Sequence, residues 1–483
     1  MNSTIENAKR QILTKRSVVG FIKQLVPALV AALCCVSAFA IDEVPPDIVL
    51  TQDTTIENIS GGYNGMVRQT IYINGYTLTL YNTEDSTYLG YIVSTGNIIK
   101  TGSKTLTLGN PTINYTGTIT VSEGTLNLTE NGTLSKLSAV INNGVIDMNV
   151  FQVLNNLSGA GIINISSGTD LDLKNTTDTT YSGQILGDGA ISVGGPGKLT
   201  LSGANTYPGG AYVYSNGYLR LTGSALDYTG TLTVNVGTVD FDVEGSNTIK
   251  RIDVSSDNAI SAYNGSKMIK SGDGTLQICC EASGLVSADS VFISSGRVDY
   301  QGYFESDASF GSPRAPKDCF VVEEGAVFSP GIGVGDVILN GGNFTIRDNA
   351  IALFEFGAYN EDSALQNYDT ITINGEYCKT VLNSNSIIQL AFTNDDAWKW
   401  AKEGAEYHII TEGFTFNPND GDFSYVLGNY QDYFKLVARE DQGFYLIGLG
   451  APEPPPVVPE PSTWALLILG VAGLLYLKKL RKK

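Results

Sequence analysis

Three carboxylates that alternate along one stretch of chain are the residues best placed for chemistry. Asp240, Asp242 and Glu244 each follow an apolar residue, so in an extended strand all three project from the same face. Carboxylate oxygens gathered in this way can bind Ca²⁺, and a solvated acidic face is the alternative. Asp170 and Asp172 present the same choice. The solvated face is the commoner arrangement, so we predict no metal site, no cofactor and no catalytic residue, and we keep Asp240, Asp242 and Glu244 as a calcium candidate.

Aromatic residues offer a second kind of site, a platform for sugar rings. Trp398 and Trp400 would share a face in a strand but not in a helix, where packing in the core or in a cap is the expected role. Tyr212 and Tyr214 alternate on an outward face. They predict either an aromatic ladder for extracellular polysaccharide or stacking of tyrosines between neighbouring strands.

Cysteine and histidine usage limits other chemistries. His408 is the single histidine, which excludes histidine-rich metal sites and argues against a histidine-dependent catalytic triad. Four cysteines lie beyond the N-terminal segment: Cys279, Cys280, Cys319 and Cys378. None forms a Cys-x-x-Cys pair, so a zinc site is not expected. Disulfides are compatible with export, but the spacing does not specify which cysteines pair.

The chain that must position these residues is built from short, repeated strands. Glycine, at 54 residues, and many β-branched residues favour strands and tight turns over helices. One unit recurs, in which a glycine, a Leu-containing strand, a Tyr-x-Gly motif and a second strand follow in order. Copies begin at Gly102, Gly195 and Tyr228, with weaker copies at Tyr63 and Tyr181 and a partial copy at Gly272. Apolar and polar residues alternate within the copies, which predicts half-buried strands.

Stacking of such units predicts a solenoid. A single unit cannot bury its apolar face, whereas stacked units can, because each strand bonds to the equivalent strand above and below it. We therefore predict an all-β fold, a parallel β-helix with aliphatic stacks inside and Thr, Asn and Asp outside. Antiparallel β-sandwiches are the alternative, since their strands alternate in the same way. The units repeat in order as well as in pattern, which favours the solenoid.

Part of the repeat resembles a known family. The run from Gly195 to Gly209, Gly-Pro-Gly-Lys-Leu-Thr-Leu-Ser-Gly-Ala-Asn-Thr-Tyr-Pro-Gly, is similar to the autotransporter-associated β-strand repeat. Residues 102–128 and 228–242 resemble that repeat less closely. The repeat occurs in passenger-like regions of large secreted bacterial proteins, and the resemblance implies a right-handed parallel β-helix. No translocating barrel follows the repeats, so we do not expect a complete autotransporter.

The region after the repeats is expected to close the solenoid. We assign residues 41–304 to the repeat solenoid and residues 305–448 to terminal β rungs and a C-terminal β cap, because solenoid ends need polar covers. One short helix is expected from Asn394 to Gly404, with Asn394 as its N-cap.

The N-terminus has the form of a secretory signal peptide. Five basic residues precede an apolar run from Leu25 to Ala40, and Ala38-Phe39-Ala40 fits the rule for signal cleavage. We predict that residues 1–40 are the signal peptide, that cleavage follows Ala40 and that export machinery delivers a chain beginning at Ile41. A permanent membrane helix is the alternative, for which the run is short.

The C-terminus combines three features in a fixed order. After a Pro-rich linker at residues 449–458, residues 459–483 contain Pro459-Glu460-Pro461, an apolar run at 464–477 and a basic tail. This order resembles the PEP-CTERM sorting signal. The resemblance implies processing near Pro459, Glu460 and Pro461 by an exosortase-type enzyme, and delivery to the cell surface or extracellular matrix.

The apolar run of the C-terminus also predicts a membrane segment. Fourteen residues are short for about 30 Å of hydrocarbon, but flanking residues and snorkelling lysines extend the reach. The basic end predicts that the tail faces the cytoplasm, with the chain anchored in the membrane through 464–477 until it is processed. An ordinary tail anchor after a proline linker is the alternative.

Charge excludes one class of partner. Between the basic termini, residues 41–477 hold 20 basic and 48 acidic side chains, a net charge of −28. A body this acidic repels phosphate backbones, so we expect no nucleic-acid partner.

Two functions are compatible with these observations. The first is an exported structural or adhesive β-helix protein of the cell surface or extracellular matrix, with no enzymatic activity. The alternative is a β-helix polysaccharide lyase or hydrolase, in which strand-borne acids act with Ca²⁺ and a basic residue, Arg220 being the nearest outward candidate. We favour the first function because the sequence holds no catalytic cluster, and a fold alone does not specify an enzyme.

Overall fold

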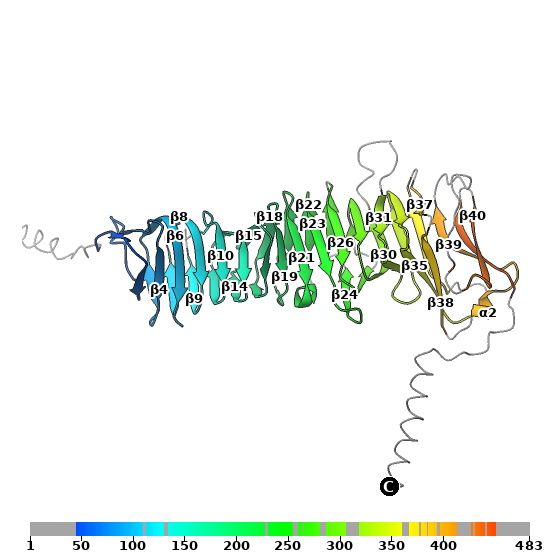
Figure 1. The fold of residues 1–483 in the computed structure, drawn as a ribbon, viewed down its shortest axis with the longest axis horizontal. Helices are drawn as coiled ribbons and strands as arrows, with labels where there is room; N and C mark the ends of the chain where they lie inside the picture. The colour runs from blue at the N-terminus through cyan, green and yellow to red at the C-terminus, as the bar shows by residue number, and fades with distance from the viewer. Residues whose placement is uncertain are drawn as a thin grey trace, which may run out of the picture.

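In the computed structural model of the chain, short strands coil into an elongated rod (Figure 1). The first strands lie at one end of the rod and the last strands at the other. The structure describes residues 45–450 except 110–112, 130–133, 228–229, 255–258, 264, 281–285, 306–317, 360–366, 376–377, 384, 394–396, 413–426, 428–429 and 440–441. The prediction of an all-β fold is confirmed.

Three sheets run along the rod. The first sheet has 17 strands: β1 (Ile48–Val49), β2 (Thr54–Glu57), β3 (Thr70–Tyr72), β4 (Thr77–Tyr81), β6 (Tyr91–Thr101), β8 (Ile113–Val121), β10 (Ala139–Asn142), β13 (Leu157–Gly159), β16 (Thr179–Tyr181), β19 (Lys198–Leu201), β21 (Tyr218–Thr222), β23 (Thr238–Asp242), β26 (Lys267–Ser271), β29 (Ser290–Ile293), β31 (Asp318–Val322), β34 (Asn343–Ile346) and β37 (Thr380–Leu382). The second sheet has six: β5 (Ser86–Tyr88), β7 (Thr105–Leu108), β9 (Thr125–Leu128), β11 (Val145–Met148), β14 (Ile162–Ile165) and β17 (Gln184–Gly187).

The third sheet has 18 strands and begins midway along the first. They are β12 (Gln152–Asn155), β15 (Asp170–Lys174), β18 (Ala190–Gly194), β20 (Ala211–Tyr214), β22 (Leu232–Asn235), β24 (Ile249–Val254), β25 (Ile260–Tyr263), β27 (Thr275–Cys280), β28 (Val286–Ser287), β30 (Arg297–Glu305), β32 (Val327–Pro330), β33 (Asp336–Asn340), β35 (Ile351–Phe356), β36 (Thr370–Asn374), β38 (Ile387–Phe392), β39 (Glu406–Glu412), β40 (Phe434–Arg439) and β41 (Gly443–Gly448). Two short helices, η1 (Gly223–Asp227) and α2 (Ala397–Trp400), complete the described elements.

The pairing of strands shows how the chain coils. In the first sheet Leu199, Leu219 and Val239 lie side by side on β19, β21 and β23, so one turn of the coil takes 20 residues there. Across the described part of the chain, the ladder pairings between strands are parallel except for β39–β41 and β40–β41. Long parallel sheets built from successive turns are the arrangement that the repeats predicted, and they exclude the antiparallel sandwich.

Alternation of side chains sets the core. In β4, Leu78 and Leu80 point inward and are buried, whereas Thr77 and Thr79 between them are half-buried on the outer face. Equivalent positions stack from turn to turn and form one continuous apolar core along the rod. Burial of one such leucine stabilises the fold by about 1.5 to 3 kcal/mol, so the stacks hold successive turns together.

The Tyr-x-Gly motif makes a corner of the coil. The hydroxyl of buried Tyr181 donates a hydrogen bond to the carbonyl oxygen of Gly161 in the preceding turn, at 2.7 Å. A side chain cannot replace Gly183, because a Cβ there would lie 2.0 Å from the same carbonyl oxygen. Tyr115 repeats the bond to Gly96 at 2.6 Å. The motif therefore joins two successive turns of the coil.

One of the weaker repeats was assigned wrongly. The ring of Tyr63 is exposed in a loop, so Tyr63-Asn-Gly is not a corner of the coil. The corner is instead made by Tyr88-Leu-Gly90, in which Tyr88 is buried and its hydroxyl donates to the carbonyl oxygen of Gln69 at 3.3 Å. The Tyr-x-Gly spacing is the same in both places, and only the flanking strand pairings distinguish them.

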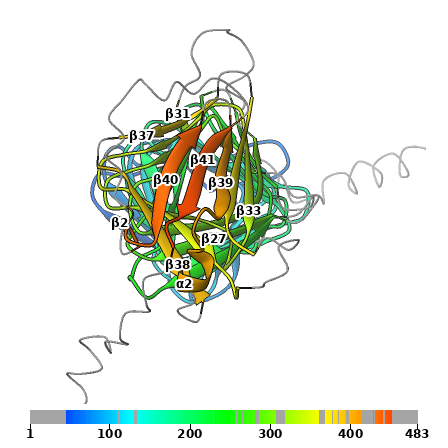
Figure 2. The same ribbon diagram turned by 90° about the vertical axis from the view of Figure 1, so that its right-hand side faces the viewer.

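An antiparallel layer closes the C-terminal end. Figure 2 shows β39, β40 and β41 lying across that end, with α2 beside them. The predicted short helix is confirmed as α2, while its proposed cap, Asn394, lies outside the described residues. Trp400 is buried and packs edge-on against Phe356 and Tyr407, whereas Trp398 is 41% exposed. The two tryptophans therefore do not share a face, as expected for a helix.

The predicted signal peptide and sorting signal lie outside the described residues. This applies to cleavage after Ala40, to the sorting motif and to the apolar run 464–477. Within the part of the chain that the structure describes, no helix is long and apolar enough to cross a membrane. The C-terminal membrane segment therefore stays a prediction from the sequence.

Candidate functional site

Asp240 and Asp242 lie on the outer face of the first sheet but are not solvated. Their neighbours Val239 and Phe241 point into the core, which turns both carboxylates outward on β23. Their exposed fractions are only 3% and 1%. The expectation of a solvated acidic face is therefore wrong for these two residues, because side chains from the adjoining turns cover them.

Arg220 supplies the main countercharge. It lies on β21 directly beside Asp240, one turn earlier in the coil. Its Nε donates to Oδ2 of Asp242 at 2.9 Å, and its Nη2 contacts the same oxygen. The same Nε lies 3.7 Å from Oδ2 of Asp240. One guanidinium thus serves two buried carboxylates, a charge-assisted arrangement that also fixes the position of the arginine.

Hydroxyl groups complete the coordination of Asp240. Ser271 on β26 donates to its Oδ1 at 2.6 Å, and Tyr218 donates to its Oδ2 at 3.2 Å. Burial raises the pKa of Asp240, although Ser271 and Arg220 oppose that shift. Burial likewise raises the pKa of Tyr218 to about 12, and the charge of Asp240 adds to the effect. We call Tyr218, Arg220, Asp240, Asp242 and Ser271 the charged cluster.

The third predicted carboxylate does not join this arrangement. Glu244 follows β23 and is exposed. Among the described residues, no group of three or more His, Cys, Asp or Glu side chains is placed to hold a metal ion. Arg220 contacts Asp240 and Asp242, and Lys270 also interacts with the charge of both carboxylates, so the geometry gives the calcium candidate no support.

A shallow polar trough adjoins the charged cluster. It has a volume of about 400 Å³, is open to solvent and crosses β16, β19, β21 and β23. Its lining residues are Asp178, Thr179, Thr180, Lys198, Thr200, Arg220, Thr222, Asp242 and Glu244. Lys198 lies 3.8 Å from Asp178 and is partly exposed. The trough therefore offers hydroxyls and charges of both signs, which suits hydrogen bonding to a polar ligand.

Arg220 is not placed to act as a base in the trough. Arg220, the basic residue considered for catalysis, is held by Asp242, and a guanidinium stays protonated in proteins. His408 lies on β39 at the far end of the rod, where its ring stacks on Tyr445. The other ionisable residues of the lining are Asp178, which contacts Lys198, Asp242, which contacts Arg220, and the exposed Glu244.

The remaining aromatic and acidic candidates have structural partners. The rings of Tyr212 and Tyr214 stack on each other along β20 with centroids 5.8 Å apart. The hydroxyl of Tyr214 donates to Asp172 at 2.7 Å, and Asn235 donates to that of Tyr212 at 3.0 Å. Lys174 also contacts Asp172, at 3.3 Å. These contacts use the groups that a sugar ligand would need.

The cysteines are spread over three places. Cys279 and Cys280 are free thiols on β27, both partly exposed, and Cys378 is free and buried. The Sγ of Cys378 accepts a hydrogen bond from the backbone N–H of Gly342 at 2.9 Å. Cys319 is buried on β31. No pairing of these cysteines was predicted, and none is assigned.

Two buried lysines were not found from the sequence. The amine of Lys270 points to the corner of the coil and donates to the carbonyl oxygens of Ser271, Gly272 and Ser295 at 2.7, 2.8 and 3.0 Å. Burial lowers its pKa to about 8. Lys100 makes the equivalent three bonds in an earlier turn. Both lysines are followed by Thr or Ser and then by Gly, and this shared Lys-Thr/Ser-Gly sequence is the signal that could have revealed the corner.

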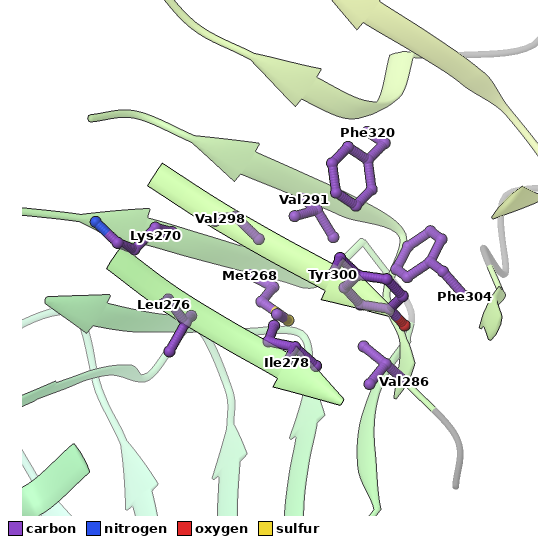
Figure 3. Close-up of a pocket in the computed structure, with 10 residues that line it drawn as sticks. All are labelled: Met268, Lys270, Leu276, Ile278, Val286, Val291, Val298, Tyr300, Phe304 and Phe320. Atoms are coloured by element: carbon purple, nitrogen blue, oxygen red, sulfur yellow. The ribbon is translucent and has the colours of Figure 1, made fainter. Parts of the chain in front are cut away.

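The gap beside Lys270 is part of the core. It measures about 10 Å³ and is lined by Met268, Lys270, Leu276, Ile278, Val286, Val291, Val298, Tyr300, Phe304 and Phe320. Figure 3 shows apolar side chains converging on the gap, while the amine of Lys270 points away from them. A space of this size holds at most about one water molecule, so it is a packing defect rather than a ligand site.

One buried carboxyl near the C-terminal end also escaped sequence reasoning. Asp369 is fully buried and accepts hydrogen bonds from the backbone N–H groups of Gly335 and Glu355, each at 2.7 Å. Burial raises its pKa to about 8 despite these bonds. The carboxyl ties the strand start at β36 to β33 and β35, which is a structural role.

Comparison with known proteins identifies the repeats and the C-terminus. Residues 98–128, 194–220 and 215–240 match the family model described as passenger-associated-transport-repeat. Residues 457–482 match the PEP-CTERM protein-sorting motif. The chain therefore contains both the repeat and the sorting motif that the sequence analysis predicted, at the predicted places.

One curated relative is similar over about two thirds of the chain. The adhesin BmaC autotransporter of Brucella suis biovar 1 (strain 1330) is 26% identical over 393 residues, which covers 68% of this chain and 11% of the relative. The chain thus spans about a tenth of that relative's length. No solved structure gives a significant match.

Proposed function

We propose that this chain is an exported, surface-located adhesive or structural protein and not an enzyme. The observation that carries the proposal is the order of its parts. A continuous β-solenoid is closed at its C-terminal end, and the match to the sorting motif begins a few residues later. The solenoid would act as a rigid spacer that holds its N-terminal end away from the envelope.

The sorting motif supports the choice of partners. An exosortase-type enzyme would recognise Pro459, Glu460 and Pro461 and process the chain there. Export machinery would first remove residues 1–40 after Ala40, and the run 464–477 would hold the chain in the membrane until processing. Extracellular polysaccharide is a further proposed partner. The similarity to an adhesin supports a location at the cell surface.

The finer features of the fold belong to the same proposal. We infer right-handed winding, because crossovers between parallel strands of one sheet are nearly always right-handed. The passenger-associated repeats support the same hand. The division into a repeat solenoid at 41–304 and terminal rungs with a cap at 305–448 remains our assignment.

The alternative function, a polysaccharide lyase or hydrolase, rests on the polar trough. Its threonines and charges give hydrogen-bonding groups on an open surface about the size of a small ligand site. The pairing of Arg220 with Asp242 weakens this alternative, since it occupies the basic residue that we considered for catalysis.

Digestion of intact cells with added protease tests the proposed function. The full chain is expressed in a host that contains an exosortase, and its accessibility to added protease is compared with that of a variant lacking residues 459–483. We expect the wild-type chain to be cleaved by protease on intact cells, and the truncated chain to be missing from the surface. Equal cleavage of both chains by the added protease would show that the sorting motif is not needed to reach the cell surface.

An activity screen separates the two functions. Purified chain is incubated with acidic and neutral polysaccharides, with and without Ca²⁺, and products are measured by reducing ends and by absorbance of unsaturated sugars. We expect no product. Turnover of a polysaccharide by the wild-type chain that is lost in the Arg220→Lys variant would favour the lyase or hydrolase function instead.

A further inference from the structure

The N-terminal end of the solenoid has an uncovered strand edge. β1 pairs with β3 and β2 pairs with β4, and within the described residues no strand lies on the other side of β1 or β2. At the C-terminal end, by contrast, β39 to β41 form an antiparallel layer. The two ends of the described rod are therefore different, and among the residues that the structure describes β1 and β2 have a partner strand on one side only.

Hydrogen bonding identifies the backbone groups that face this edge. The N–H of Asn58 donates to the carbonyl oxygen of Tyr81 on β4, at 2.9 Å. Backbone groups of successive residues in a strand point to opposite sides. Thr55 and Glu57 therefore direct their N–H and C=O groups away from β4, toward the free edge. A free edge of this kind is a template for pairing with another strand.

The side chains at the edge specify the next layer. Ile48 and Ile56 end the inward stacks and are only partly buried, so an added strand with apolar inward residues would continue the core. Residues 45–67 hold three acidic side chains and no basic one, and the exposed Glu57 is among them, while Arg68 follows and lies over the ring of Tyr63. An added strand with basic outward residues would meet complementary charge.

Exposed apolar residues also gather at this end. Seven of the thirteen large apolar residues that are exposed in the described part of the chain lie between Val49 and Tyr81. They include Met66, which is 83% exposed, in the loop between β2 and β3. Large exposed apolar surfaces mark interaction sites, and this end carries more than half of the large exposed apolar residues of the described chain. The like charge of two acidic ends opposes pairing of one copy with another.

We propose that the edge of β1 and β2 binds an extended, basic polypeptide segment by strand addition. The main chain of the partner would bond to the outward groups of Thr55 and Glu57. Its alternate apolar residues would cover Ile48 and Ile56, and its basic residues would lie beside Glu57. This mode of recognition takes affinity from the backbone and selectivity from the alternate side chains. The inference stands on the edge geometry and not on export or sorting.

Peptide binding to the purified full-length chain tests the proposal. The probe is a fluorescent, end-blocked peptide of four Lys-Val repeats, with a peptide of four Glu-Val repeats for comparison, and the readout is fluorescence anisotropy. We expect the Lys-Val peptide to bind the wild-type chain better. Thr55→Pro removes one outward N–H and should weaken binding by about tenfold, whereas Thr55→Val keeps that donor and should leave binding within about twofold.

Charge reversal provides an independent readout that a folding defect would not mimic. Glu57→Lys should weaken binding of the Lys-Val peptide and strengthen binding of the Glu-Val peptide. The matched control is Asp188→Lys, on an exposed corner remote from the edge, which should change neither. Equal binding by wild type and Thr55→Pro would overturn the proposal, and so would equal effects of Glu57→Lys and Asp188→Lys. A dimer that Thr55→Pro abolishes, without peptide binding, would assign the edge to a second copy and also overturn it.

Discussion

The charged cluster shows what strand spacing can and cannot tell at the scale of single residues. Spacing placed Asp240 and Asp242 correctly on one outward face. It did not show their burial, because the groups that cover them come from other turns of the coil. Arg220 precedes Asp240 by 20 residues, which is the local repeat length, so aligning the repeats would have placed it beside the pair. Ser271 comes from a longer turn and could not be placed that way.

Removal of the arginine should be costly. Arg220→Ala leaves Asp240 and Asp242 buried without their countercharge, and we expect a loss of about 3 kcal/mol in the free energy of unfolding. Combining Arg220→Ala with Asp242→Asn should recover part of that loss, because one buried charge is removed with its partner. Urea unfolding followed by circular dichroism measures both. A loss below about 0.5 kcal/mol for Arg220→Ala would mean that solvent screens the cluster.

Asp369 should make stability depend on pH. Its pKa is about 8 in the folded chain, whereas the unfolded chain releases this proton near 4. Between these values the folded chain holds the additional proton, so this contribution to stability is present at low pH and is lost as pH rises through about 8. Asp369→Asn should flatten the change in unfolding free energy from pH 5 to 7 by up to about 1.4 kcal/mol per pH unit.

Tryptophan fluorescence can follow that unfolding locally. The rings of Trp400 and Tyr368, the neighbour of Asp369, have centroids 6.2 Å apart. Denaturation curves at several pH values are compared for the two chains. The same pH slope in wild type and Asp369→Asn would show that Asp369 is ionised in the folded state.

At the scale of elements, the corner of the coil explains why the sequence repeats. The order of glycine, strand, Tyr-x-Gly and strand could be recognised in the sequence because it recurs at successive corners. At each corner the tyrosine hydroxyl bonds to the preceding turn, and the glycine leaves room for that turn. The Tyr63 assignment failed, since Tyr-x-Gly also suits an exposed loop. The lysine corners were missed because a lysine in a strand pattern is usually read as an outward residue, whereas Lys270 bends its amine back to three carbonyl groups.

Substitution of the corner glycine tests this explanation. Gly183→Ala places a Cβ 2.0 Å from the carbonyl oxygen of Gly161, so the two turns must separate, and we expect a loss of about 2 kcal/mol or more. Tyr181→Phe removes only the hydroxyl bonds and should cost about 1 kcal/mol. Gly168→Asn is the control, because that glycine has open space and a positive φ that Asn tolerates. Thermal unfolding that ranks Gly168→Asn as the most damaging would contradict this role of the corner.

At the scale of the whole molecule, the rod has a direction. Stacking predicted the solenoid and the need for a cap, and both conclusions depended only on repetition and on the cost of exposed ends. The difference between the ends was not predicted, because the first strands of a repeat array look like any others in the sequence. Figure 1 places the start and the end of the described chain at opposite ends of the rod. Sorting through the C-terminus would therefore leave the open strand edge outermost.

The open edge should also be the least stable part of the rod. β1 and β2 have a neighbouring turn on one side only, whereas β16 and β19 are held on both sides. We expect hydrogen exchange at residues 48–57 to be at least about tenfold faster than at residues 198–201. Mass-spectrometric exchange of peptic fragments measures this difference. Uniform protection along the rod would show that the first turn is covered.

The masses of the mature chain's two ends test the central claim most directly. Protein recovered from the surface of the native host is digested, and its terminal peptides are sequenced by mass spectrometry. Export and sorting predict an N-terminus at Ile41 and a C-terminus close to Pro459-Glu460-Pro461, without the apolar run 464–477. A chain recovered only inside the cell, beginning at Met1 and ending at Lys483, would contradict the account.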